Sequence, residues 1–348
     1  MRTIATCALG PDSAGTVLMK LLRDARHSID AAVYEVGPSY RWALVRAAER
    51  GVRVRLVLDA HVSDGNAATA RALSAAGGAC RVAGVGAESS HGKLLIVDST
   101  VAVGTGNLIW RDAPRDRHLR LPPAGAPLAG TREWWVTAAR SRQLHGTALD
   151  AFDAHWTKAT APPPWWAATA HAAVDHPTIP SIGTPMPQIG PRVVCARRRR
   201  LGLIIGGSVI AATLGMMISR ARRRVLVTVP YARPEVPPVR DLLERMADAC
   251  SRGVACALLI GGVPDPRDAG RLAALEFPVR RMDPARSTSG HAKGLVADGA
   301  VVVSSANWSE TGLGGNWEVA MRVEHPAAAA YYAAAWRRDW ETGLRIDV

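Results

Sequence analysis

The chain carries one structural plan twice, and this internal repeat limits its fold more than any other feature. The segment "GTVLMKLLRDARHSIDAAVYEVG" returns as "AATLGMMISRARRRVLVTVPYAR", in each case a helix that leads into a short apolar strand. A helix, a turn and a buried strand follow in both copies, with Arg50-Gly51-Val52 matched by Arg252-Gly253-Val254. Helices that alternate with short apolar strands predict sheets covered by helices, so we expect two α/β halves.

We expect the 348 residues to divide into three segments. The first half spans residues 1–158 and the second spans residues 201–348, while residues 159–200, rich in Pro, Ala and Arg, form a linker. The apolar stretch 201–218 has the minimal length of a transmembrane segment. Its second half repeats the first helix of the opening copy, so we favour a buried element and keep the membrane span as the alternative.

Charge and cysteine content indicate the partners and the compartment. The net charge of +13 favours anionic partners. Five cysteines without a Cys-x-x-Cys pair argue against a disulfide framework and against a zinc site. The first residues show no signal-peptide pattern. We therefore expect a cytoplasmic protein, with peripheral contact to a membrane left open. We expect a monomer because both halves would form one site.

Lysine is scarce in this chain, yet half of its lysines lie in two matching motifs. Only four of 43 basic residues are lysines, and two of them stand in His91-Gly92-Lys93 and His291-Ala292-Lys293. An aspartate and an asparagine follow at the same offsets in both copies, as Asp98 and Asn107 and as Asp298 and Asn307. Period-two alternation places His and Lys on one face of a strand and the Asp on the other. A hairpin would then bring His, Lys and Asn around one point.

This set of side chains suits phosphoryl chemistry. Lysine and asparagine offer donors to the non-bridging oxygens of a phosphoryl group. Histidine can attack phosphorus or shuttle a proton near neutral pH. Two copies face to face therefore give one nucleophile and one general acid, which is what a two-step phosphodiester exchange needs.

The two motifs resemble the signature of the phospholipase D superfamily, His-x-Lys-x4-Asp followed by Gly-Ser-x-Asn. The resemblance implies two homologous α/β sandwich halves related by a pseudo-two-fold axis, with one active site at their seam. It also implies a covalent phosphohistidine and a reaction that uses no metal and no cofactor. Thr105 stands where the family has Ser, and Ser304 where it has Gly.

The resemblance assigns a role to each motif residue. His91 would be the nucleophile and His291 the acid, although the sequence leaves open which of the two attacks. The remaining residues would bind phosphate (Lys93, Lys293, Asn107, Asn307, Thr105 and Ser305), orient the histidines (Glu133 and Glu318) or brace the motif strands (Asp98 and Asp298).

The expected partner is an anionic phosphodiester. We favour a phospholipid, acted on by a phospholipase D-type hydrolase or phosphatidyltransferase. The alternatives are a nuclease with the same two-histidine mechanism and, less favoured, a non-catalytic phosphate-binding scaffold.

Residues outside the motifs receive ordinary interpretations. We expect His61, His155 and His171 on the surface, and the pair Trp134-Trp135 in the core. For Trp165-Trp166, a loop cover and a contact with bases or a membrane interface are equally favoured.

Overall fold

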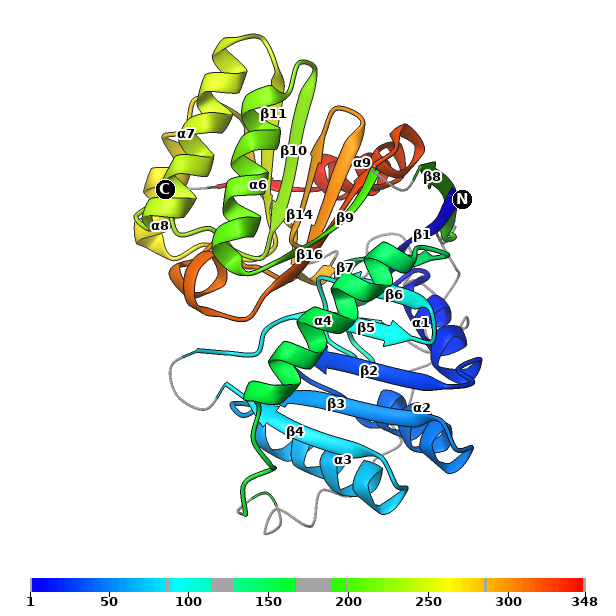
Figure 1. Cartoon of the computed structure of the whole chain (residues 1–348). Helices are drawn as coiled ribbons and strands as arrows, with labels where there is room; N and C mark the ends of the chain where they lie inside the picture. Colours follow the sequence, from blue (N-terminus) through cyan, green and yellow to red (C-terminus); the bar gives the residue numbers. More distant parts are fainter. Residues whose placement is uncertain are drawn as a thin grey trace.

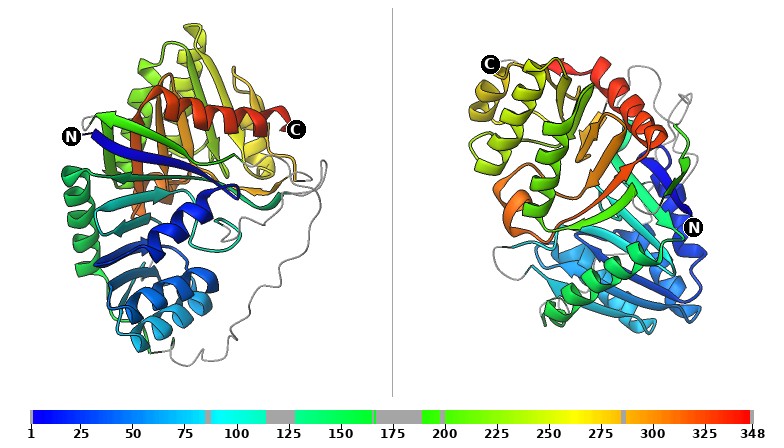
Figure 2. Two further views of the ribbon diagram at one scale, coloured as in Figure 1. Left: turned by 90° about the vertical axis from the view of Figure 1, so that its right-hand side faces the viewer. Right: turned by 45° about the horizontal axis from the view of Figure 1, so that its top comes forward.

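The computed structural model describes residues 2–84, 88–113, 128–164, 166, 189–197, 200–284 and 287–346. Two mixed sheets lie one beside the other, each with helices on both faces (Figure 1). Two further views show the same pair of halves packed against each other (Figure 2). The two α/β halves predicted from the repeat are confirmed.

The first sheet contains strands from both ends of the opening half. Its strands, in spatial order, are β4 (Ala79–Ala83), β3 (Arg53–Asp59), β2 (Ser28–Val33), β5 (Lys93–Val97), β6 (Thr100–Gly104), β7 (Leu128–Ala139), β1 (Arg2–Gly10) and β8 (Arg192–Arg197). A ninth strand, β13 (Ser287–Gly290), comes from the second half and pairs with β7. Strand β2 is parallel to β3 and antiparallel to β5. The helices of this half are α1 (Ala14–Arg23), α2 (Pro38–Glu49), α3 (Ser63–Ala75) and α4 (Arg142–Lys158).

The second sheet repeats this order. Its strands are β17 (Leu344–Arg345), β12 (Val279–Arg281), β11 (Ala255–Ile260), β10 (Arg224–Val229), β14 (Gly294–Ala297), β15 (Ala300–Ser304), β16 (Val319–Glu324) and β9 (Leu201–Ile205). Its helices are α6 (Gly207–Arg220), α7 (Pro237–Ser251), α8 (Pro266–Ala273), α9 (Pro326–Glu341) and the short π-helix η2 (Thr311–Gly315). From β12 to β9 each strand has its counterpart between β4 and β1, as a duplicated unit requires.

One hydrophobic core runs through both halves. It joins Phe152 of α4 and Val103 of β6 with Val303 of β15 and Trp336 of α9. Separate clusters lie under the outer helices of each half, around Leu44 and around Leu243 respectively. Because the central cluster spans the seam, burial of apolar surface holds the two halves together.

The end of the linker differs from the sequence expectation, whereas the apolar stretch 201–218 agrees with the favoured prediction. The end of the predicted linker, Arg192–Arg197, is strand β8 and pairs with β1 at the edge of the first sheet. The apolar stretch 201–218 contains β9 and most of α6, separated by Gly206 with a φ of 93°, as the repeat predicts. Helix α6 buries Ile210 and exposes Val209. Within the described residues, no helix is both long enough and apolar enough to cross a membrane.

Candidate active site

Both histidine–lysine motifs lie at the seam, at the starts of matching strands. Lys93 opens β5 and Lys293 directly precedes β14, and both side chains are buried. At the other end of each strand, Asp98 and Asp298 adopt a positive φ, 50° and 49°. The Asp98 carboxylate accepts the backbone N–H groups of residues 26–28 at 2.8–3.0 Å, and Asp298 accepts those of residues 222–224 at 2.9–3.0 Å. This geometry suits the bracing predicted for the two aspartates.

Each histidine is paired with the glutamate of the opposite half. His91 Nδ1 lies 2.9 Å from Glu318 Oε1, and His291 Nδ1 lies 2.7 Å from Glu133 Oε1. Both glutamates are fully buried. Among the described contacts, Nε2 is therefore the nitrogen of the His91 ring left for substrate, whereas Nε2 of His291 also lies 2.7 Å from Lys293 Nζ.

The backbone explains this crossed pairing. The residue before each histidine runs parallel to the residue before the other half's glutamate, Ser90 beside Trp317 and Gly290 beside Arg132. The Trp317 N–H donates to Ser89 O at 3.0 Å, and the His291 N–H donates to Arg132 O at 3.1 Å. These backbone contacts hold the residues around each histidine against the glutamate strand of the other half.

The hydroxyl groups of Thr105 and Ser305 donate hydrogen bonds to the two glutamates. This finding corrects our expectation that the two hydroxyls bind phosphate. Thr105 donates to Glu133 Oε2 and Ser305 donates to Glu318 Oε2. Each hydroxyl also accepts a backbone N–H at 2.9 Å, and both residues are fully buried. A hydroxyl has a single proton to donate, so neither has one left for a phosphate oxygen.

The two lysines form a buried positive centre. Lys93 Nζ donates to His91 O at 2.6 Å, and Lys293 Nζ donates to His291 O at 2.5 Å and to Thr105 O at 3.2 Å. Lys293 Nζ also lies 2.7 Å from His291 Nε2. Burial lowers the pKa of Lys93 to about 8 and that of Lys293 to about 7. An anion between the two ammonium groups would offset this cost of burial.

Burial also affects the histidines and glutamates. Burial and the neighbouring Lys93 lower the pKa of His91 to about 4, and burial with Lys293 lowers that of His291 well below its ordinary value. Burial raises the pKa of Glu133 to about 7. Burial acts the same way on Glu318, but His91 and other hydrogen-bond partners outweigh it and leave the pKa of that carboxyl below its ordinary value. The two His–Glu pairs are therefore not electrostatically equivalent.

Asn107 and Asn307 occupy matching positions beside these pairs. In each, the side-chain oxygen is buried and has no hydrogen-bond partner among the described residues. Buried polar atoms are rarely left unpaired in a folded protein. An amide oxygen accepts hydrogen bonds, so each of these two atoms could pair with a donor group of a ligand.

One further carboxylate, Asp112, lies at this site and was not singled out from the sequence. It is 5% exposed, and its Oδ2 accepts the Asn107 N–H at 2.7 Å. Asp112, Glu133 and His291 offer ligand atoms within 4.8 Å of one another, which makes them a candidate for holding a metal ion. The Lys293 ammonium already lies against His291, so a positive charge is present there without a metal.

His155 was expected on the surface, and this prediction is wrong. The residue is 8% exposed, its Nε2 lies 2.7 Å from Ser90 Oγ, and its ring stacks on Trp317 at 4.2 Å. Its spacing from Leu144, Ala148 and Phe152, which are buried on the same face of α4, was the signal that could have placed it.

The other aromatic and histidine predictions have mixed outcomes. Trp134 and Trp135 are buried, as predicted. The side chain of His61 is 41% exposed and its Nδ1 lies 2.8 Å from Asp59 Oδ1. Trp166 is buried, while Trp165 and His171 lie outside the described residues.

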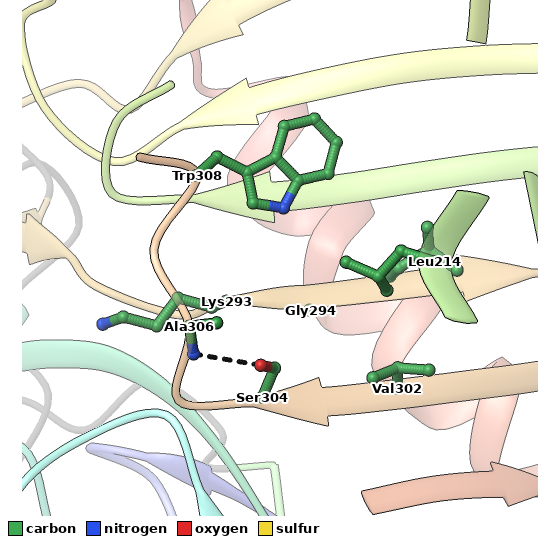
Figure 3. Close-up of a pocket in the computed structure, with 8 residues that line it drawn as sticks. Leu214, Lys293, Gly294, Val302, Ser304, Ala306 and Trp308 are labelled. Atoms are coloured by element: carbon green, nitrogen blue, oxygen red, sulfur yellow. Dashed lines mark hydrogen bonds between the residues drawn. The ribbon is translucent and has the colours of Figure 1, made fainter. Parts of the chain in front are cut away.

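A small cavity lies behind Lys293 (Figure 3). Leu214, Leu295, Val302 and Trp308 form much of its wall, and the Lys293 ammonium points away from Leu214. Its volume of about 10 Å³ suits a single water molecule. The cavity is therefore too small to take an acyl chain or a base.

Comparisons with known proteins agree with this architecture. The family model described as "Cardiolipin synthase, PLD-like domain" matches residues 18–117 and 214–340, one segment in each half. No curated protein matches the chain in sequence.

Two solved structures show the same fold over nearly the whole chain. Phosphatidylserine synthase from Haemophilus influenzae Rd KW20 has a TM-score of 0.67 and 12% identity, covering 97% of this chain and 86% of the synthase. Polyphosphate kinase from Porphyromonas gingivalis has a TM-score of 0.60 and 14% identity over 97% of this chain. This chain spans 50% of the length of that kinase.

Proposed function

Because the chain belongs to the family of phospholipase D-like domains, with a match in each half, we propose that it cleaves a phospholipid phosphodiester through a covalent phosphohistidine. The family is one of phosphodiesterases and phosphatidyltransferases. The observation that carries the proposal is the crossed pairing of His91 with Glu318 and of His291 with Glu133. It leaves two imidazole Nε2 atoms beside two buried lysines, as an in-line exchange at phosphorus needs.

The proposed reaction has two steps. In the first, the Nε2 lone pair of one histidine forms a bond to phosphorus, the bond from phosphorus to the leaving oxygen breaks, and the other histidine gives that oxygen a proton. In the second, water or an alcohol gives its proton to the second histidine and attacks phosphorus, and the P–N bond breaks. Water yields a phosphomonoester, and an alcohol yields a new phosphodiester.

The lysines and asparagines would stabilise the charge on the transferred group. In this proposal Lys93 and Lys293, with the amides of Asn107 and Asn307, donate to non-bridging phosphoryl oxygens. No metal or cofactor enters these steps. We further propose that segments 1–158 and 201–348 act as one catalytic unit in a monomer, joined by residues 159–200.

Three observations support a lipid substrate. The matching family model is that of cardiolipin synthase, and a similar structure is a phosphatidylserine synthase. The net charge of +13 also suits an anionic membrane surface. The same charge would suit nucleic acid, so a nuclease is the rival outcome of the test.

The test is an activity assay on two substrates in parallel, in the presence of EDTA. Mixed phospholipid vesicles report head-group release or exchange, and single-stranded and duplex DNA report cleavage, with His91→Asn as the inactive control. Lipid turnover that the variant loses is the expected result. Cleaved DNA with intact lipid would reassign the protein as a nuclease, and activity that EDTA abolishes would overturn the metal-free mechanism.

A further inference from the structure

The residue before each catalytic glutamate is contacted by a helix of the opposite half. From α4 of the first half, His155 stacks on Trp317, with ring centroids 4.2 Å apart and an angle of 7° between the planes. From α9 of the second half, Asp339 accepts two hydrogen bonds from Arg132, at 2.8 and 3.2 Å. His155 and Asp339 also match in sequence, since each stands directly before a tryptophan. The same contact therefore occurs twice, once as a ring stack and once as an ion pair.

His155 makes a second contact, with the residue before His91. Its Nε2 lies 2.7 Å from Ser90 Oγ, and both side chains are buried. The matching position in the other half is Gly290, which has no side chain that could form such a bond. His155 therefore contacts the sequence neighbours of both members of the His91–Glu318 pair.

Ser90 is held by its backbone as well as by its side chain. Its N–H donates to Oδ2 of the fully buried Asp59 at 2.6 Å. Its backbone runs parallel to that of Trp317 in the other half. The bond from His155 to Oγ adds a third restraint. The position of the His91 ring depends on these contacts, because its backbone continues directly from Ser90.

The Trp317 ring contacts both His155 and the histidine motif. A Cβ at Gly92 would lie 2.0 Å from Trp317 Cζ3, so the indole lies directly against the backbone next to His91. Trp317 itself directly precedes Glu318. Movement of the His155 ring would therefore act on both ends of the 2.9 Å contact between His91 Nδ1 and Glu318 Oε1.

His155 is placed to support this geometry and not to react. The residue is 8% exposed, and its Nε2 is already engaged by Ser90. Burial lowers the pKa of His155 to about 4, so the ring is neutral near neutral pH. A neutral imidazole nitrogen and a hydroxyl group can form one hydrogen bond between them, whichever of the two donates.

We infer that His155 is a positioning residue: through Ser90 and Trp317 it holds His91 and Glu318 in the geometry that turnover requires. The inference rests on the proposed phosphodiester chemistry, although no step of that reaction passes through the His155 ring. A displacement of about 1 Å, caused by a substitution away from the reacting atoms, can lower a rate about 100-fold. Loss of the bond to Ser90 would permit a displacement of this kind at His91.

Two substitutions separate the hydrogen bond of His155 from its ring stack. His155→Phe keeps a ring on Trp317 but loses the bond to Ser90, whereas His155→Gln keeps a polar group that can donate or accept. Turnover is followed as release of 4-nitrophenol from bis(4-nitrophenyl) phosphate. We expect His155→Phe to lower kcat about 10- to 100-fold and to change KM by less than about threefold. His155→Gln should recover most of this loss.

A double-mutant cycle tests whether His155 and Ser90 act through one bond. Ser90→Ala should lower kcat as much as His155→Phe does, and the double variant should be no slower than the slower single variant. His145→Phe is the matched control, because this second histidine of α4 lies 2.8 Å from Asp98 O, beyond the far end of β5. It should leave kcat and KM unchanged. Losses that multiply in the double variant, or an equal loss in His145→Phe, would overturn the inference.

Proton NMR gives a readout that needs no turnover. The pKa of Glu318 lies below its ordinary value, so its carboxylate accepts the His91 Nδ1–H, and an imidazole proton in such a bond resonates far downfield. The signal that His91→Asn removes identifies this proton. It should shift or broaden in His155→Phe and stay unchanged in His145→Phe.

Thermal unfolding reports whether each variant is folded, and Ser90→Ala, which loses the same bond, takes the place of His155→Phe if that variant does not fold. An unchanged downfield signal in the folded variant would overturn the inference. A wild-type protein that shows this signal but cleaves no diester would instead overturn the proposed function.

Discussion

Replacing Arg132 should destabilise the protein more than any surface change, because this side chain is the buried centre of an ionic network. Arg132 lies in β7 beside Glu133 and is 2% exposed. Its Nη1 donates to Asp12 Oδ2 at 2.6 Å and to Gly10 O at 3.0 Å. Its Nε and Nη2 donate to the two oxygens of Asp339 in α9, at 2.8 and 3.2 Å. The network joins β7 of the first half to the last helix of the second.

The magnitude follows from what the substitution leaves behind. Arg132→Met keeps much of the volume but removes the buried cation of Asp12 and Asp339, leaving Arg338, 36% exposed and 3.7 Å from Asp12 Oδ2, as a weaker partner. Removing one partner of a buried ionic set costs about 3–5 kcal/mol. Replacing the whole set by neutral groups costs far less, because no buried charge remains uncompensated. The triple variant Arg132→Met/Asp12→Asn/Asp339→Asn should therefore recover most of the loss.

Urea unfolding followed by tryptophan fluorescence at neutral pH measures both variants against the wild type. A common core spans the halves, so a single cooperative transition is expected. We expect the midpoint to fall strongly for Arg132→Met and to return towards the wild type for the triple variant. A single variant within about 1 kcal/mol of the wild type, or a triple variant less stable than the single one, would refute this reasoning.

Three further predictions concern the seam. Glu318→Gln should lower kcat about 10³- to 10⁴-fold with little change in KM, because the His91 imidazole loses the acceptor that fixes its tautomer. Steady-state kinetics measure this loss, and a decrease in kcat below tenfold would contradict the role of Glu318 in orienting His91. Burial lowers the pKa of His155 from 6.5 to about 4, so the unfolded state takes up the proton first and stability falls as pH drops from about 6.5 to about 4. His155→Phe should remove roughly 2–3 kcal/mol of that pH-dependent loss in the free energy of unfolding, measured by urea unfolding at several pH values. If the variant's free energy of unfolding falls with pH as steeply as that of the wild type, His155 is not the cause. A Cβ on Gly92 would lie 2.0 Å from Trp317 Cζ3, so Gly92→Ala should cost about 1–3 kcal/mol in thermal unfolding. Gly146→Ala, with no atom within 4 Å, should instead stabilise α4 by about 0.5–1 kcal/mol; equal shifts would disprove the steric argument.

The internal repeat predicted most of the fold and the positions of the main side chains of the site. Matching offsets placed His91 and His291 just before equivalent strands, and the same alignment pointed to Glu133 and Glu318. Local spacing determines such positions, because a strand alternates its faces and a hairpin brings its ends together. For that reason the motif residues could be read from the sequence alone.

The relations between the halves could not be read in this way. Identical spacing in two copies does not say which glutamate meets which histidine, since that depends on how the halves pack. For the same reason the sequence did not reveal the second carboxylate at Asp112, which stands 21 positions before Glu133 along the chain. The hydroxyls of Thr105 and Ser305 matched a family position, but their hydrogen-bond partners depend on two buried strands that only the folded chain brings together.

Joining the two copies in one polypeptide has a consequence for how the site can change. In a pair of identical chains every substitution occurs twice, once on each side of the dyad, so the two sides must stay chemically alike. Here one half has the carboxylate Asp112 five residues after its motif asparagine, while the other half has Gly312, in η2, at the matching position. Covalent linkage thus gives a duplicated site the freedom to specialise its two sides separately, while the crossed His–Glu pairs keep each half dependent on the other.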